Sequence, residues 1–167
     1  MSLRRGFLVV SIGLAASTVA ATTAASATVI TSVKVGGSPS RPVFTITGKG
    51  LSVPAPSPKG SPSNTQGCPL KIKGKAGHDY GTQFYVDAFA TGTGEDKQLY
   101  SAGRYRPTLN ENDCIGLTVL SHTPTRVTFT FGSAYSQYRS QYRTLLNGDL
   151  IEVVLKGAKF GLVVHYG

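Results

Sequence analysis

Short runs of alternating apolar and polar residues constrain the fold of this chain more than any other feature. The clearest is residues 43–47, in which Phe44 and Ile46 face one way and the intervening residues face the other. A period of two is typical of a strand with one buried face. Gly48 and Gly50 follow, and they favour a turn because glycine accepts backbone conformations that other residues resist.

Similar runs occur along the rest of the chain and are separated by Gly, Pro, Asn and Ser. Further strands are expected at 28–35, 71–75, 83–89, 97–102, 115–120, 126–131, 149–156 and 159–166. No long helical period is present, so about eight or nine short strands predict an all-β fold, an immunoglobulin-like β-sandwich. The first of these strands is expected to end in a turn at Gly36-Gly37-Ser38-Pro39, and Gly157-Ala158 is expected to form the last hairpin turn.

One segment, residues 133–147, lacks this pattern and is expected to be a short helical or irregular crossover. Within it, the tetrapeptide 136–139 is repeated at 140–143. In a helix the equivalent side chains would stack four residues apart, and in a strand they would share a face. The tyrosine and arginine side chains of this repeat either bind sugars and anions or pack on the rim of the sandwich. The aligned pairs are Tyr138 with Tyr142 and Arg139 with Arg143.

The N-terminus has the pattern of an export signal. A basic start with Arg4 and Arg5 precedes an apolar stretch, and Ala25-Ser26-Ala27 has the form of a cleavage site. We therefore expect residues 1–27 to be a signal peptide, removed by the Sec or the twin-arginine route, rather than a membrane anchor. The mature chain would be a single domain, residues 28–167, secreted or associated with the cell envelope, with no membrane span.

Cys68 and Cys114 are the two cysteines of the chain. In an exported protein such a pair predicts one disulfide. Closing a loop of this size would stabilise the fold by about 4 kcal/mol in the chain-entropy model. The sequence has no C-x-x-C, and no His follows either cysteine at the spacing of a metal ligand, so no metal and no cofactor are expected.

The net charge favours anionic partners. Of 17 Lys and Arg residues, 15 would remain after cleavage, against 8 Asp and Glu, so the mature chain carries 15 − 8 = +7. Acidic glycans and anionic lipid headgroups are partners of this kind. The charge could also be ordinary solubilising charge, since the cations are scattered. Lysines at 71–75 would likewise suit either edge protection or anion binding.

A binding edge is expected where three segments meet. Residues 52–69 contain many prolines and form a long surface loop, a type of segment that often carries function. Arg104, Tyr105 and Arg106 repeat the Tyr/Arg chemistry of residues 138–143 and precede a loop that leads to Cys114. A disulfide would bring this loop close to the proline-rich one. The hypothesis is one edge that binds an extended acidic or hydroxyl-rich partner.

Catalytic motifs are missing from the sequence. There is no G-x-S-x-G, H-E-x-x-H or phosphate-binding loop. His78 and Asp79 are adjacent and would face opposite sides of a strand. Asp87, Glu95 and Asp96 could supply a carboxylate pair or a calcium site, but we expect them to be solvated. The protein is therefore expected not to be an enzyme.

The opening of the mature chain resembles the start of IPT/TIG domains. The similarity covers residues 28–51: a short apolar strand, a Gly/Pro turn at 36–39, and the turn Gly48-Lys49-Gly50-Leu51, in which Leu51 stands where Phe is usual. The resemblance implies an immunoglobulin-like sandwich outside the cell, in a family with mostly binding and structural roles. It provides no catalytic residues.

These observations favour a non-catalytic module of the cell surface that recognises an envelope polysaccharide or a surface protein. The alternative is a secreted effector, such as a protease inhibitor or a small hydrolase. Nucleic acid is not expected as a partner, because known nucleic-acid-binding motifs are absent and export removes the usual partners.

If the edge binds acidic polymer, replacing Arg104 and Arg106 by Ala should weaken binding of the purified protein to cell-envelope fractions, and the loss should depend on salt. Binding that both variants retain would rule out this edge as the site.

Overall fold

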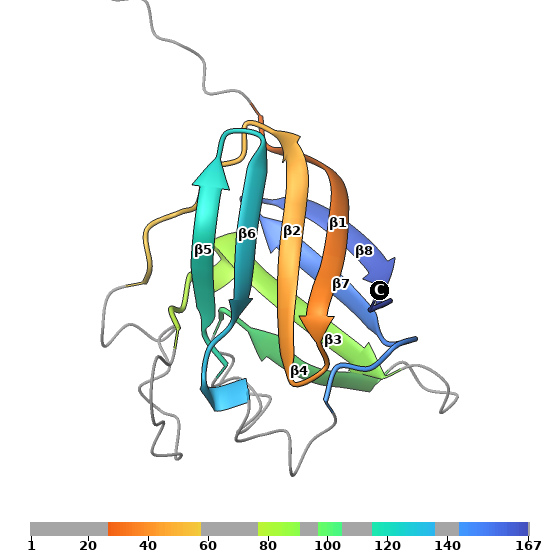
Figure 1. Cartoon of the computed structure of the whole chain (residues 1–167). Coiled ribbons are helices and arrows are strands. Elements are labelled where there is room, and N and C mark those ends of the chain that lie inside the picture. Colours follow the sequence, from red (N-terminus) through yellow and green to blue (C-terminus); the bar gives the residue numbers. More distant parts are fainter. Residues whose placement is uncertain (1–26, 58–76, 91–96, 105–114, 136–143, 167) are drawn as a thin grey trace, which may run out of the picture.

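Two antiparallel sheets of four strands each face one another in the computed structural model (Figure 1). The structure describes residues 27–57, 77–90, 97–104, 115–135 and 144–166. In spatial order, the first sheet contains β1 (Val29–Ser38), β2 (Arg41–Lys49), β6 (Arg126–Phe131) and β5 (Leu117–Thr123). The second sheet contains β4 (Lys97–Ala102), β3 (Phe84–Ala90), β7 (Leu150–Leu155) and β8 (Ala158–Val163). The prediction of an all-β sandwich is confirmed.

Each sheet is assembled from two hairpins that are far apart in the sequence. The β1–β2 and β5–β6 hairpins form the first sheet by pairing β2 with β6. The β3–β4 and β7–β8 hairpins form the second sheet by pairing β3 with β7. The chain therefore passes between the sheets three times, and a 3-10 turn, η2 (Gly81–Gln83), ends the first passage. No helix within the described ranges is long and apolar enough to span a membrane.

An aromatic cluster joins the two sheets. Phe44 and Phe129, on adjacent strands of the first sheet, stack with ring centroids 4.9 Å apart. Phe84, on β3 of the second sheet, meets Phe129 edge-on at 5.0 Å. All three side chains are fully buried, together with Ile46 and Val127. The inward faces predicted from the alternation of residues 43–47, 83–89 and 126–131 are thus confirmed.

Two predicted turns are wrong in position. The turn expected at residues 36–39 begins later, because β1 continues to Ser38 and the chain reverses at Pro39 and Ser40. The last hairpin turns at Lys156-Gly157, one residue earlier than expected. Both residues have positive φ, 49° and 83°. A two-residue hairpin turn with positive φ at both positions matches the twist of the strands. Lys156 takes the first position, although a positive φ is unfavourable for a residue with a side chain.

The predicted crossover at 133–147 is described only at its ends. Ala134 and Tyr135 have helical conformation, and residues 144–149 lead into β7. The Tyr/Arg repeat at 136–143 lies outside the described residues. So does the strand predicted at 71–75.

Phe129→Ala should remove the ring that contacts both sheets. Because the cavity would be fully enclosed, the free energy of unfolding should fall by about 3–5 kcal/mol. Thr128→Ala, on the outward face of the same strand, is the control and should cost about 1 kcal/mol or less. Chemical denaturation followed by tyrosine fluorescence measures both. Equal losses in the two variants would contradict the proposed role of Phe129.

Candidate binding surface

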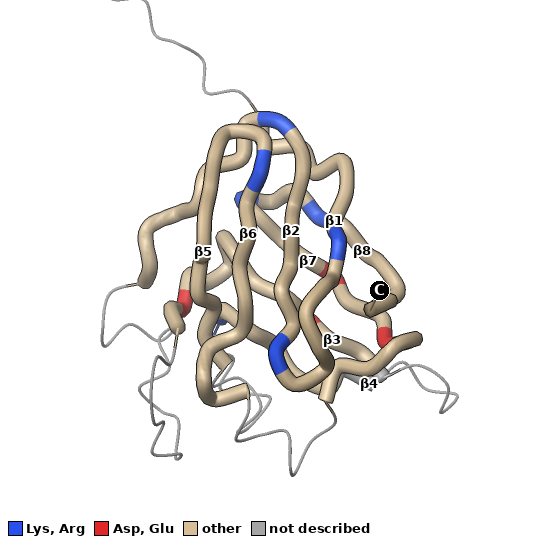
Figure 2. Tube along the Cα trace, viewed as in Figure 1, with Lys and Arg blue, Asp and Glu red and all other residues tan. Residues whose placement is uncertain are grey.

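Charge is distributed unequally between the two sheets (Figure 2). The strands of the first sheet contain four cations and no Asp or Glu. Those of the second sheet contain two cations, Lys97 and Lys159, and two acids, Asp87 and Glu152. The four cations of the first sheet are Lys34, Arg41, Lys49 and Arg126, and all four are exposed.

Hydroxyl side chains surround these cations on the outer face of the first sheet. In one row across the strands, Lys34 is followed by Thr45, Thr128 and Ser121. In the next row, Ser32 and Thr47 precede Arg126 and Thr123. Phe44, Phe129 and Phe131, the aromatic residues of these four strands, are buried. These two rows therefore offer charge and hydrogen bonds, and they contain no Phe, Tyr or Trp.

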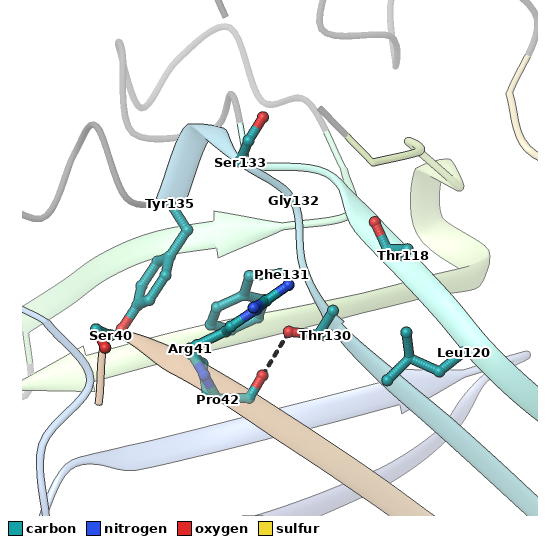
Figure 3. Close-up of a pocket in the computed structure, with 10 residues that line it drawn as sticks. All are labelled: Ser40, Arg41, Pro42, Thr118, Leu120, Thr130, Phe131, Gly132, Ser133 and Tyr135. Atoms are coloured by element: carbon teal, nitrogen blue, oxygen red, sulfur yellow. Dashed lines mark hydrogen bonds between the residues drawn. The ribbon is translucent and has the colours of Figure 1, made fainter. Parts of the chain in front are cut away.

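A hollow of about 500 Å³ lies at one end of this face, where β2 begins and β6 ends (Figure 3). Arg41 extends into it from β2, and Thr118 and Thr130 are among the residues that line it. Ser133 lines it too, but its hydroxyl oxygen is buried. Leu120 forms an apolar part of the rim and is 54% exposed.

The backbone on both sides of Arg41 is held in place. The hydroxyl of Tyr135 donates to the carbonyl of Pro39 at 2.8 Å and accepts a hydrogen bond from the backbone N–H of Leu145. The hydroxyl of Thr130 donates to the carbonyl of Pro42 at 2.6 Å. The long Arg41 side chain thus starts from a fixed backbone position, which limits the entropy that a ligand must remove.

Arg104, predicted as a binding residue, lies on the outer face of the second sheet. Its guanidinium forms an ion pair with Asp87 at 2.5 Å, donates to the hydroxyl of Ser101 and lies 3.5 Å above the ring of Tyr85. Ser101 also donates to Asp87. Asp87 is only 6% exposed, so the expectation that it is solvated is wrong. Burial of a carboxylate is tolerated here because a cation and a hydroxyl satisfy it.

The other predicted site residues lie outside the described residues. They are Cys68, Tyr105, Arg106, Cys114, Tyr138, Arg139, Tyr142 and Arg143. Of the predicted edge, the structure therefore describes Arg104 and the first part of the proline-rich loop, residues 52–57.

Two further buried acids have local structural roles. Asp79 accepts a hydrogen bond from the backbone N–H of Gly81, and Asp149 accepts one from that of Leu146. His78 is exposed whereas the adjacent Asp79 is buried, as expected from their adjacency. Within the described part of the chain, no three His, Cys, Asp or Glu side chains are grouped as metal ligands would be.

The outer face of the first sheet, with the exposed cations Lys34, Arg41, Lys49 and Arg126, is called the basic face below. It was not predicted from the sequence, although the chain carries a signal for it. The first acid of the sequence is Asp79, and none lies between Asp113 and Asp149. Both hairpins of the first sheet come from these acid-free stretches. Their common sheet becomes evident only once β2 is known to pair with β6.

No family model, curated protein or solved structure matches the chain. A functional assignment therefore depends on the residues of this chain.

Arg104→Ala should leave the Asp87 carboxylate buried without its cation. The free energy of unfolding should fall by about 3 kcal/mol. The double variant Asp87→Ala/Arg104→Ala should be more stable than Arg104→Ala alone, because the unpaired charge is gone. If the losses in free energy of unfolding of the two single variants simply add in the double variant, the proposed coupling between Asp87 and Arg104 is wrong. The same measurement is needed before a loss of binding in Arg104→Ala is attributed to a lost contact.

Proposed function

We propose that the protein is a non-catalytic binding module that holds an anionic polysaccharide of the cell envelope on the outer face of its first sheet. The observation that carries this proposal is the presence of four exposed cations and no acid on the strands of that sheet. Both ion pairs described, Arg104–Asp87 and Lys159–Glu152, lie on the second sheet. The cations of the first sheet have no such partner among the described residues.

The spacing of the cations fits an extended polymer better than one small anion. Lys34 and Arg126 lie on β1 and β6, with β2 between them, and in adjacent rows. Strands are about 4.8 Å apart and alternate residues about 7 Å apart, so the two side chains start roughly 12 Å from each other. Separate anionic groups along one chain can reach both, and the intervening threonines can bind sugar hydroxyls.

Several features support an extracellular location. The N-terminal signal pattern and the IPT/TIG-like opening both indicate export, and the sandwich agrees with the immunoglobulin-like fold that the resemblance implies. We also propose the Cys68–Cys114 disulfide. His78 and Leu117 exchange backbone hydrogen bonds, so the described residues that flank segments 58–76 and 105–114 lie side by side.

Neutralising the first sheet should weaken polymer binding. We expect Lys34→Gln/Arg126→Gln to reduce binding to an acidic envelope polysaccharide roughly tenfold or more, because each cation near an anionic surface contributes about 1 kcal/mol. The matched control is Lys156→Gln/Lys159→Gln, which removes the same charge from the β7–β8 hairpin. Co-sedimentation at about 0.05 M and about 0.5 M salt measures the effect and its screening.

Wild-type binding that disappears at high salt, together with a loss confined to the first pair of substitutions, would support the proposal. Equal losses in both double variants would mean that only net charge matters and would reject the first sheet as the site. No binding at low salt would reject an anionic polymer as the ligand.

A further inference from the structure

The hollow at Arg41 has the chemistry of a specific subsite within the basic face. Arg41 is the cation of the first sheet that extends into a walled space, as Figure 3 shows. Its guanidinium has no ion-pair partner among the described residues, and it can only donate hydrogen bonds. Two parallel N–H groups of a guanidinium match the two oxygens of a carboxylate or a phosphate.

Thr130 supplies the opposite hydrogen-bonding property in the same hollow. Its hydroxyl proton is committed to the Pro42 carbonyl at 2.6 Å. A hydroxyl has one proton and two lone pairs, so the Thr130 oxygen retains capacity only to accept. A ligand must donate a hydrogen bond to use it. A sugar or polyol hydroxyl can do so, whereas a carboxylate or a fully ionised phosphate ester cannot.

Leu120 adds a third element to the hollow. It is the exposed large apolar residue of β5 and lies on the rim of the hollow. An apolar side chain of this kind can pack against the C–H groups of a sugar or polyol. The hollow thus combines a cationic donor, a neutral acceptor and an apolar contact.

We propose that this hollow binds one anionic, hydroxyl-bearing unit of the polymer, either a uronic acid or a polyol phosphate. Arg41 binds the anionic group in a bidentate manner, and the Thr130 oxygen accepts from a neighbouring hydroxyl. The inference rests on the proposed function, because it names the unit that the basic face would recognise. Lys34 and Arg126, on the open part of the face, contribute charge without this selectivity.

The test uses small probes and the purified, isotope-labelled protein. Glucuronate and glycerol 1-phosphate are titrated separately at about pH 8, above the second pKa of a phosphate ester. Acetate and methyl phosphate are the control anions, because neither carries a hydroxyl group at that pH. The backbone amides of Thr130 and Gly132 and the Arg41 Nε–H are followed by NMR. We expect both hydroxylated probes, or one of them, to shift these signals and to bind more tightly than the simple anion of the same charge type. Whichever of the two probes binds more tightly identifies the recognised unit as a uronic acid or a polyol phosphate.

Variants of Arg41 test the bidentate contact. Arg41→Gln should raise the Kd of the preferred probe about tenfold or more, in line with the loss of charge-assisted hydrogen bonds. Arg41→Lys keeps the charge but loses the planar group, and should recover only part of the affinity. Lys156→Gln, in the turn of the second sheet, loses the same charge and should bind the probe like the wild type. Arg41 is exposed, so these substitutions leave the core unchanged.

Probes that bind Arg41→Gln as tightly as the wild type, or that do not bind at all, would overturn the inference. Acetate or methyl phosphate binding as tightly as its hydroxylated counterpart would overturn the role of Thr130. These failures are distinguishable from failure of the proposed function. Salt-sensitive polymer binding that Arg41→Gln retains would reject the hollow alone, whereas probe binding without any polymer binding would reject the polymer alone.

Discussion

The contact of Phe129 with rings on both sheets is the interaction on which the rest of the structure depends. Phe129 stacks on Phe44 beside it and meets Phe84 across the sandwich. Phe44 also packs against Phe131 at 4.8 Å, and Phe131 lies beneath the hollow that Arg41 enters. The inward rings therefore fix how the two sheets pack, and the backbone pairing of β2 with β6 aligns the outward rows of threonines and cations.

The two outer faces of the sandwich use charge in opposite ways. On the second sheet, Arg104 is bound to Asp87, Ser101 and Tyr85, and Lys159 is paired with Glu152. On the first sheet, the cations stand among hydroxyl groups. An Arg whose guanidinium is already paired with a buried carboxylate gains little from a second anion, because its charge is neutralised and its hydrogen-bond donors are in use. An exposed Arg retains the capacity to bind one, which is why the basic face is a stronger candidate than Arg104.

Local patterns in the sequence were sufficient to predict the positions of most of the described strands. The runs at 97–102 and 126–131 coincide with β4 and β6, and the inward residues were identified by their alternation. The turn at Lys156-Gly157 was misplaced because a lysine with positive φ is not expected from its residue type. Asp87 was misjudged because its partner, Arg104, follows it by 17 residues across a hairpin. The hollow could not be predicted from local sequence patterns, because Thr130 and Pro42 are 88 residues apart and come into contact only when β2 pairs with β6.

The alternating hairpins also determine when this chain can fold during its synthesis. The first sheet lacks β6, which joins its two hairpins, until residue 131 has been made, and the second lacks β8 until residue 163. An isolated hairpin is marginally stable in water, and pairing strands so distant in sequence requires costly loop closure. The sandwich of the described strands therefore cannot close before residue 163 has been made. Until then the growing chain lacks a closed core, and an open chain can be drawn through an opening that is too narrow for a folded domain.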